Sequence, residues 1–455
     1  MERPTEAGTE ATLPDSNGQD PSLAAQAIVA GEVEEAQGEA SEPQQPLSPL
    51  QSFWYCVANL GYGAFYSFNN AVLPLFLQNY TQDARLIGLM GSTHSFEGAV
   101  IQPVVGSASD RLRTRLGRRR PFMLVFTPLS ALFMLLTPAA SHLPIGVRLT
   151  AIVGCIFLFT VFFNVAFDPY QALMPDITPE PQRGRVMGLW AFLGVLGQAA
   201  LVMLPQPPAV KFGIVAVLML ITTGWTCAMI REPRHPAHSA ADKSHWQEVF
   251  IALRGLRILR QARRSLIALF FSGIGIGAVL PFLTLFVEKI AGANDQQAQR
   301  MFLVLMLATA AGVIPCGWLT DRIGPKRMLL LGLALIALAS LNGLWVTNLT
   351  QITLVMILAG LGNAAQSASA YPLLTELVPA EEIGFYTGLQ TTALSVASPL
   401  TSVLTGELVN QGGYRLIFVV CAASILIALG VLALVSLQAA RDEVGLRNRQ
   451  QGRAP

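Results

Sequence analysis

Charged residues are scarce in this chain of 455 residues. Asp, Glu, Lys and Arg make up only 13% of the sequence, whereas soluble globular domains contain about a quarter. Hydrophobic residues make up 52%. This composition excludes an ordinary soluble domain and indicates a protein whose solvent is largely lipid.

Cysteine is equally rare, and all five cysteines lie inside apolar segments. They are Cys56, Cys155, Cys227, Cys316 and Cys421. No two of them have the spacing of metal ligands, and their placement does not suggest a disulfide framework. We therefore expect no metal site and interpret the cysteines as small buried hydrophobic residues.

The motifs of common enzyme classes are also missing. The chain has no phosphate-binding lysine loop, no H-E-x-x-H zinc motif and no G-x-S-x-G nucleophile motif. We expect no catalytic residue, no enzyme activity, no cofactor and no nucleic-acid partner. Without a nucleotide-binding motif, any energy that the protein uses must come from an ion gradient or from the gradient of a solute.

Bases are nearly absent from the first 50 positions, which hold ten acidic residues and one base, Arg3. The segment lacks aromatic residues and is rich in Glu, Gln, Ala, Gly and Pro, so it cannot bury enough apolar surface to order itself. We expect residues 1–50 to be a disordered acidic tail and not a signal peptide.

Long apolar runs are abundant. Reading each run of about 20 residues as a membrane-spanning helix predicts twelve helices, at 52–78, 86–108, 122–141, 147–171, 184–204, 209–230, 266–288, 299–319, 327–346, 351–374, 386–408 and 414–437. The one long connection lies halfway along and divides the helices six plus six. We expect an all-α membrane protein built from two pseudo-symmetric six-helix bundles. The expected domains after the tail are a bundle at 51–232, a cytoplasmic linker at 233–264, a bundle at 265–438 and a cytoplasmic C-terminal tail at 439–455.

Positive charge gathers in one set of loops. Six arginines lie between Arg111 and Arg120, after the second apolar run, and the connection at 231–265 has eight bases. Loops rich in Lys and Arg stay in the cytoplasm, so we expect a multi-pass protein of the cell membrane with both termini cytoplasmic. Residues 246–264 show an amphipathic, basic pattern, which predicts a helix on the inner leaflet; the alternative is a solvated linker.

Two motifs occur once in each half. G-x-x-x-D-R, followed by a glycine and a basic cluster, begins at Gly106 and again at Gly317. The segment "LMPDITPEPQRGRVMGL" at 173–189 matches "LLTELVPAEEIGFYTGL" at 373–389. Duplicated six-helix halves are typical of transporters, whose substrate site lies between the repeats.

The first of these motifs resembles that of the major facilitator superfamily. Its longer first copy, which ends in Gly117-Arg118-Arg119-Arg120-Pro121, resembles the sugar–cation symporter branch, including plant sucrose–proton symporters. A second pattern of that branch, P-x-R-A-L-x-x-D, is matched by Pro169, Ala172, Leu173 and Asp176. Gln171 replaces the arginine of this pattern and Thr160 replaces an acidic residue, so the resemblance implies a sugar-like solute but not sucrose itself.

Three ionisable residues fall deep within predicted spans, where charge is costly and marks a functional candidate. His94 and Glu97 lie one helical turn apart, so their side chains can touch. Asp168 shares a helical face with Asn164 and Gln171. We interpret Asp168, Glu97 and His94 as candidate proton-coupling residues. The alternative for His94 and Glu97 is a structural hydrogen bond.

Polar residues recur at helical spacing on the first, fourth and tenth spans, which line the central cavity in the superfamily. The substrate-cavity candidates are Asn59, Tyr62, Tyr66, Asn70, Asn164, Gln171, Asn363, Gln366 and Tyr371. Amides bind hydroxyl groups and aromatic rings stack on the apolar faces of sugars, so these residues favour a hydrophilic solute. Alternatively, they join helices to one another.

Loops of opposite charge lie on the predicted cytoplasmic side. In the superfamily, helix 2 packs against helix 11 and helix 8 against helix 5, which brings the basic loop near an acidic one in each repeat. We expect these contacts to close this side when the cavity faces outward; the alternative is that the arginines serve topology and anionic lipid only. The motif and gate residues are Gly106, Asp110, Arg111, Gly117, Arg118, Arg119, Arg120, Asp176, Arg183, Arg185, Gly317, Asp321, Arg322, Gly324, Glu376, Glu381 and Glu382.

Together these features predict a monomeric secondary transporter, surrounded by membrane lipids, that moves a sugar or similar polyhydroxylated solute by alternating access with H+ symport. Two alternatives stay open. One is a proton-coupled exporter of amphipathic or drug-like compounds in the same fold. The other is a non-transporting membrane scaffold or receptor that uses the acidic tail.

Overall fold

The computed structural model describes residues 47–112, 114, 116–230, 232, 259–379 and 382–450. Residues 47–455 belong to one compact unit, which is the subject of the description below. Within the described residues every regular element is a helix, apart from one isolated bridge between Thr114 and Gly117. The predicted tail up to residue 46 and the predicted amphipathic helix up to residue 258 lie outside these residues.

The first half follows the predicted order of spans. Its elements are α2 (Pro49–Ser67), η1 (Phe68–Val72), α3 (Leu73–Leu77), α4 (Ala84–Arg111), α5 (Arg120–Ala139), η2 (Ala140–His142), α6 (Ile145–Ile177), α7 (Glu180–Met203) and α8 (Pro208–Met229). The segments α2, η1 and α3 follow one another without a loop and together correspond to the first predicted span. Helices α4 to α8 correspond to the second to sixth.

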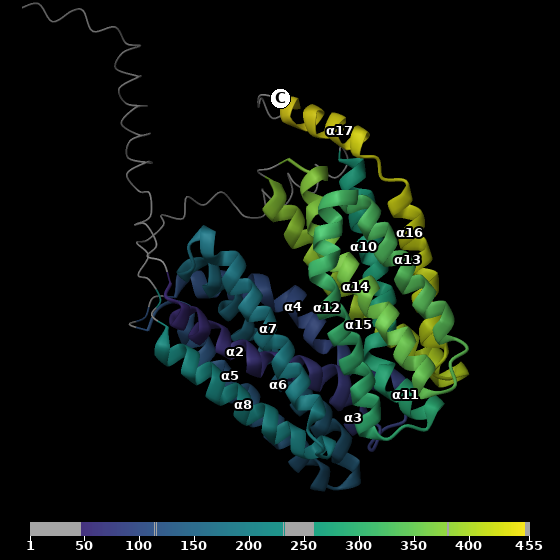
Figure 1. The fold of residues 1–455 in the computed structure, drawn as a ribbon. Coiled ribbons are helices and arrows are strands. Elements are labelled where there is room, and N and C mark those ends of the chain that lie inside the picture. Colours follow the sequence, from purple (N-terminus) through teal and green to yellow (C-terminus); the bar gives the residue numbers. More distant parts are fainter. Residues whose placement is uncertain are drawn as a thin grey trace, which may run out of the picture. The chain divides into compact units, whose positions relative to one another are not determined.

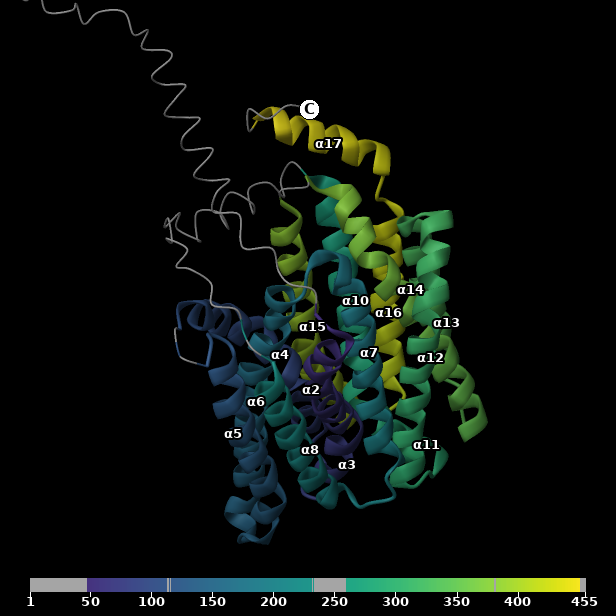
Figure 2. The ribbon, with the colours of Figure 1, turned by 60° about the vertical axis from the view of Figure 1, so that its left-hand side comes forward.

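The second half repeats the pattern. Its elements are α10 (Arg260–Val279), η3 (Leu280–Phe282), α11 (Leu283–Ala291), α12 (Asp295–Ile323), α13 (Pro325–Gly343), α14 (Leu349–Leu377), α15 (Ile383–Gly412), α16 (Leu416–Ala433) and α17 (Leu437–Gln450). Nine helical segments of the described chain are long and apolar enough to cross a membrane. Figures 1 and 2 both show α5, α6 and α8 in one bundle and α13, α14 and α16 in the other. The predicted all-α membrane fold is confirmed.

Two helices are interrupted at the same four residues, Ala-Val-Leu-Pro. The first copy, Ala71–Pro74, spans the change from the π-helical turn η1 to α3; the second, Ala278–Pro281, spans the change from α10 to the 3-10 turn η3. Proline has no amide hydrogen and breaks the helical bonding pattern. Both prolines lie against α4, because a methyl group at Gly91 would be 3.3 Å from Pro281 Cβ and 3.9 Å from Pro74 Cγ.

The two halves exchange helix contacts. Helix α4 packs against α15 of the second half, and α7 packs against α12. Within the first half, α2 and α7 pack backbone to backbone: a methyl group at Gly197 would lie 1.9 Å from the carbonyl oxygen of Leu60, and one at Gly63 would lie 2.2 Å from that of Gly194. Small residues allow this close approach, as in other membrane helix pairs.

The helices fall into two length classes. Helices α5, α8, α13 and α16 have 20, 22, 19 and 18 residues, which correspond to about 27–33 Å at about 1.5 Å per residue. Helices α6, α12, α14 and α15 have 33, 29, 29 and 30 residues. The short helices carry exposed apolar side chains such as Ile221, Leu338 and Leu426, which form the surface for lipid.

Candidate functional site

The candidate site is built around Asp168 on α6. Asp168 is 7% exposed, and its Oδ2 atom has no hydrogen-bond partner among the residues that the structure describes. Tyr66 on α2 interacts electrostatically with this carboxyl group. A carboxylate in such an apolar place needs a proton or a cation beside it, so the site is suited to bind either.

Aromatic rings pack around Tyr66, the residue that interacts with Asp168. The ring centroid of Tyr66 lies 5.5 Å from that of Phe163 and 5.5 Å from that of Phe167, in an edge-on arrangement with both. Phe163 and Phe167 stack along α6 with their centroids 5.4 Å apart and are buried. Ring faces attract cations. The carboxylate and the partly exposed Tyr66 together favour a ligand that is both cationic and apolar.

Two buried tyrosines hold α6 against α2 next to Asp168. The Tyr55 hydroxyl donates to the carbonyl oxygen of Tyr170 at 3.1 Å, and the Tyr170 hydroxyl donates to that of Tyr55 at 3.0 Å. Pro169 lies between Asp168 and Tyr170 and cannot donate a backbone hydrogen bond. The reciprocal bonds therefore fix the helix at the point where the proline weakens it.

The nine residues predicted to line the cavity divide into two groups. Those in the first group use their polar side chains in packing: Asn59 with the Trp190 carbonyl, Tyr62 with Thr127, Asn70 with the Tyr66 carbonyl, Asn164 with the Thr160 carbonyl, and Gln366 with Ser272. The second group is partly or fully exposed and consists of Tyr66, Gln171, Asn363 and Tyr371. The part of both groups in lining a cavity stays a prediction.

Asn69 is the residue that helical spacing offers as the alternative to Asn70. It lies in η1 and is fully buried, and neither polar atom of its amide has a hydrogen-bond partner within the described part of the chain. A π-helical turn has more residues than an α-helical one, so it shifts the face on which the following residues lie. Such turns are frequent at functional sites. The spacing from Asn59 to Tyr66 therefore could not decide between Asn69 and Asn70.

His94 and Glu97 lie on α4, which is helical through both positions. Their side chains lie outside the described part of the structure, as do those of Asp110, Arg111 and Glu381. The helix keeps His94 and Glu97 one turn apart. Their part in proton coupling stays a prediction.

Two of the six clustered arginines bind carboxylates of their own half. Arg118 Nη2 and Arg119 Nε lie 2.9 and 2.5 Å from Asp176 Oδ2. Glu232, just beyond α8, accepts a hydrogen bond from the backbone amide of Arg119 at 3.0 Å and lies 3.7 Å from Arg118 Nε. Arg120 donates to the carbonyl oxygen of Cys227. The cluster thus ties the loop after α4 to the ends of α6 and α8.

Gly117 permits this arrangement. Its φ of 106° lies in the region that favours glycine, and a Cβ atom there would lie 2.2 Å from Glu232 Oε2. The Glu232 side chain is only 1% exposed. No local sequence pattern marks Glu232, because the turn that surrounds it comes from a loop far earlier in the chain.

The remaining gate residues lie near the ends of their helices. Arg183 donates to the carbonyl oxygen of Thr178 at 3.2 Å, and the guanidinium of Arg322 lies 3.5 Å from the ring centroid of Trp318. Gly324 has a φ of 89° between α12 and α13. The exposed members are Arg185, Asp321, Arg322 and Glu376. Contacts of these residues between the two halves stay a prediction.

The two halves are joined at one end of the bundles, formed by the turns at residues 78–83, 204–207, 292–294 and 413–415. We call it the outer end, because the charge pattern predicts that it faces outward. Six polar contacts among the described residues cross between the halves: Lys211 Nζ to Gln299 Oε1 at 2.6 Å, Gln78 Nε2 to Glu288 Oε2 at 2.5 Å, Arg85 Nη1 to Glu407 Oε2 at 3.1 Å, Asn410 Nδ2 to Asp83 Oδ1 at 2.8 Å, Ala84 N to Asn410 Oδ1 at 2.9 Å, and Ser92 Oγ to Ser402 Oγ at 2.7 Å. The outer end is therefore closed.

Asp83 binds both Arg85 and Asn410 in the exposed part of the outer end. Hydrogen bonds from Arg85 and Asn410 hold the pKa of its carboxyl group below the usual range. The carboxylate consequently stays charged until the pH falls below the ordinary titration range of aspartate.

Lys211 is the buried contact of the outer end, with 1% exposed. Replacing Lys211 with alanine is expected to increase the fraction of molecules open at this end about tenfold, because a hydrogen bond to a charged group contributes about 1.5–3 kcal/mol and about 1.4 kcal/mol corresponds to a factor of ten. Spin-label distances between cysteines at the exposed positions Gln206 and Arg300 measure this fraction.

The matched control for this variant is Lys289→Ala. Lys289 lies at the same end with 44% of its side chain exposed, so its removal is expected to leave the distances unchanged. Equal distance distributions in both variants would contradict a closing role for Lys211.

Comparison with known proteins adds the family relationship. The model of the Major Facilitator Superfamily matches residues 55–265 and 265–455. The multidrug resistance protein MdtG of Salmonella choleraesuis (strain SC-B67) is 26% identical over 383 residues, which cover 80% of this chain and 90% of MdtG.

Solved structures share the fold. The nucleoside transporter NupG superposes with a TM-score of 0.68 at 11% identity, covering 85% of this chain and 99% of NupG. A D-xylose–proton symporter superposes with a TM-score of 0.67 at 14% identity, covering 86% of this chain and 99% of the symporter. At these identities the likeness concerns architecture only.

Proposed function

Because this chain belongs to the Major Facilitator Superfamily and is a secondary transporter rather than an enzyme, we propose that it couples solute movement to a proton bound at Asp168. One observation carries the proposal: Asp168 Oδ2 is buried in a membrane-spanning helix and has no hydrogen-bond partner among the described residues. Intramembrane carboxyl groups of this kind mark proton and ion pathways.

The surroundings of Asp168 suggest how coupling works. The Asp168 carboxylate, which interacts with the partly exposed Tyr66, attracts a cation. A proton and a cationic solute cannot occupy the same carboxylate together. Binding of one therefore releases the other, and the solute and the proton cross the membrane in opposite directions.

We infer that the solute is a small amphipathic cation. Much of the predicted polar lining is engaged in helix packing, which reduces the number of hydrogen-bonding groups left for a sugar. The sequence similarity to MdtG, whose printed name is multidrug resistance protein, supports the same solute class. This inference favours a proton-coupled exporter over a sugar symporter.

Symport of a polyhydroxylated solute is the second candidate. Gln171, Asn363 and Tyr371 favour it, because all three keep partly or fully exposed side chains with groups that bind hydroxyls. The two candidates differ in the direction of proton movement, and this difference permits a direct test.

The test uses purified protein in proteoliposomes with an imposed pH gradient. With an acidic interior, antiport predicts accumulation of radiolabelled benzyltrimethylammonium, because each proton that leaves brings a cation in. Symport instead predicts accumulation of a radiolabelled sugar when the exterior is acidic. Accumulation of sugar alone establishes the second candidate, and fluxes insensitive to both gradients contradict proton coupling altogether.

We also propose that the end opposite the outer end closes through the charged loops. In the present structure, with the outer end closed, Arg118 and Arg119 bind Asp176 within their own half. When the outer end opens, the basic loop approaches Glu381 and Glu382. Several exposed ion pairs at about 0.2–1 kcal/mol each are enough to bias the two states about tenfold.

Reversing these two acidic charges, Glu381→Lys with Glu382→Lys, is expected to increase about tenfold the population that is closed at the outer end. Spin-label distances between cysteines at Leu116 and Arg327, both exposed, measure the opposite end. Asp442→Lys, an exposed change on α17, is the control. Distances that respond to neither change, or equally to both, would rule out this gate.

A further inference from the structure

The second half contains a cavity of about 110 Å³ that no part of the proposed proton site uses. It lies between α10, η3, α11, α12, α13, α14 and α16. Folded proteins rarely keep internal voids larger than a water molecule, because the lining atoms lose contacts. A cavity of this size in an otherwise packed bundle therefore calls for a function.

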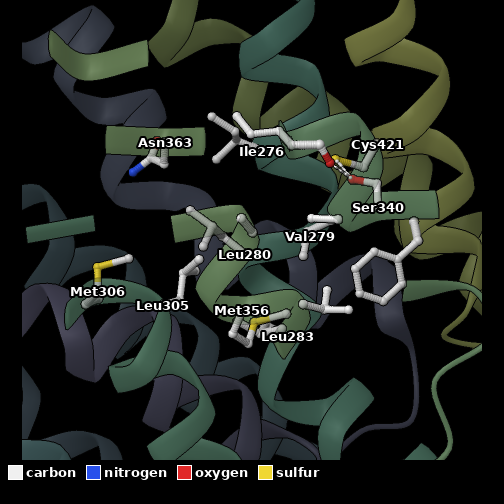
Figure 3. Close-up of a pocket in the computed structure, with 15 residues that line it drawn as sticks. Ile276, Val279, Leu280, Leu283, Leu305, Met306, Ser340, Met356, Asn363 and Cys421 are labelled. Atoms are coloured by element: carbon white, nitrogen blue, oxygen red, sulfur yellow. Dashed lines mark hydrogen bonds between the residues drawn. The ribbon is translucent and has the colours of Figure 1, made fainter. Parts of the chain in front are cut away.

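The cavity is almost entirely apolar. Ile276, Met306 and Asn363 are partly exposed, whereas Phe418 and Cys421 are only 2% and 3% exposed. Figure 3 shows Asn363 and Met306 toward one end of the pocket and Ser340 and Cys421 toward the other. Asn363 is the one polar side chain among the partly exposed lining residues, so a ligand that enters here meets a single amide and otherwise hydrocarbon.

The few polar atoms of the inner part are already bonded within the protein. The Ser340 hydroxyl lies 2.9 Å from the carbonyl oxygen of Ile336 and 3.0 Å from Cys421 Sγ. A buried water needs two to four polar partners, and these groups do not offer them. The interior therefore favours an apolar group over water.

The size of the cavity indicates the kind of group. A cavity of about 150 Å³ lined by Leu, Ile and Phe stays dry and binds benzene. The present cavity is of the same order, and Met306 and Met356 in its wall have flexible, polarisable side chains that adapt to an aromatic ring. A single ring or a short branched alkyl group fits this description.

The position of the cavity connects it to the interrupted helix. Val279 and Leu280 line one wall, and they are the second and third residues of the Ala-Val-Leu-Pro sequence at which α10 gives way to η3. A group bound here contacts the helix where its hydrogen bonding is broken. A ligand in the cavity therefore contacts the break between α10 and η3, which also lies against α4.

We propose that this cavity is the binding pocket for the apolar end of the transported solute, with Asn363 at one end. The assignment rests on the proposed function, because it assumes that the transported solute is amphipathic. Small apolar molecules dissolved in the bilayer share the chemistry of that end, and the experiment separates the two sources.

The first part of the experiment measures binding alone. Titration of fluorobenzene into the full-length protein with ¹³C-labelled methionine methyl groups is expected to shift the signals of Met306 and Met356 saturably. Met219, which is buried in the first half, serves as the internal control. Absence of a saturable shift at Met306 and Met356 overturns the proposal, whatever the fate of the proton site.

The second part fills the cavity. Ala339→Leu, at a lining position that is 2% exposed, is expected to abolish the fluorobenzene shifts and to raise the KM for benzyltrimethylammonium about tenfold. The KM for tetramethylammonium, which has no ring, is expected to stay unchanged. Ala359→Leu, at another lining position, repeats the test if Ala339→Leu does not fold, and Ala334→Leu on the exposed face of α13 is the matched control.

The outcomes discriminate between the sources. Loss of ring binding together with the selective rise in KM supports the solute pocket. Loss of ring binding with unchanged transport of both cations shows a site for bilayer-dissolved molecules and overturns the assignment to the solute. If the proposal for Asp168 is wrong, the solute fluxes do not respond to the pH gradient, while fluorobenzene still shifts the signals of Met306 and Met356.

Discussion

Asp168→Asn is expected to abolish accumulation of solute against its gradient. With one proton exchanged per solute, a gradient of about two pH units drives accumulation by about a hundredfold, because one pH unit corresponds to about 1.36 kcal/mol. Asparagine has nearly the same size and polarity but cannot bind and release a proton. It also lacks the negative charge that attracts a cationic solute, so the variant is expected to bind that solute weakly and not to concentrate it.

Accumulation ratios in proteoliposomes measure this effect, and exchange of labelled for unlabelled solute shows whether the variant still folds and binds. Asp442→Asn, at an exposed position on α17, makes the same chemical change away from the site and is expected to transport normally. An Asp168→Asn protein that concentrates solute as well as the unchanged protein would remove Asp168 from the coupling mechanism.

Asp176→Ala is expected to lower the free energy of unfolding by about 3 kcal/mol, at the lower end of the range for breaking a buried ion pair because Arg118 is partly hydrated. Asp176 accepts from both Arg118 and Arg119, and the Arg119 side chain is only 9% exposed. Removing the shared carboxylate takes an acidic partner from both guanidinium groups, while Glu232 still lies beside the Arg118 guanidinium and accepts from the backbone amide of Arg119.

Unfolding in mixed micelles, followed by circular dichroism, measures the loss. Asp321→Ala is the natural control, because Asp321 belongs to the repeated motif but is exposed, and exposed substitutions usually change stability by less than about 0.5 kcal/mol. Equal stability of the two variants would show that the arginine cluster does not stabilise the first half.

The spans were predictable because the bilayer imposes them. A hydrocarbon layer of about 30 Å requires about 20 apolar residues in every crossing helix, so the runs at 86–108 and 327–346 agree closely with α4 and α13. The duplicated motifs likewise indicated two equivalent halves. The spans and the duplicated motifs depend on local composition, which can be read from a single sequence.

The lining of the site was less predictable, because helical spacing defines a face but not the neighbour that covers it. Asn59 lies on the predicted face of α2, yet α7 approaches so closely that Asn59 donates to the Trp190 carbonyl at 2.7 Å. The cavity of the second half was hidden for the same reason. Val279, Leu280 and Met356 are ordinary apolar residues until five helices and two short segments bring them together.

The two classes of helix length indicate that the thickness of the membrane acts on the protein. Helices α5, α8, α13 and α16 match a hydrocarbon layer of about 30 Å, and each ångström of mismatch costs a fraction of a kcal/mol. These four helices therefore set the position of the protein along the bilayer normal. The longer α6, α12, α14 and α15 overshoot the layer, so they can tilt without losing their span. We therefore expect the acyl-chain length of the lipids to affect the transport cycle through these four helices and not through the solute.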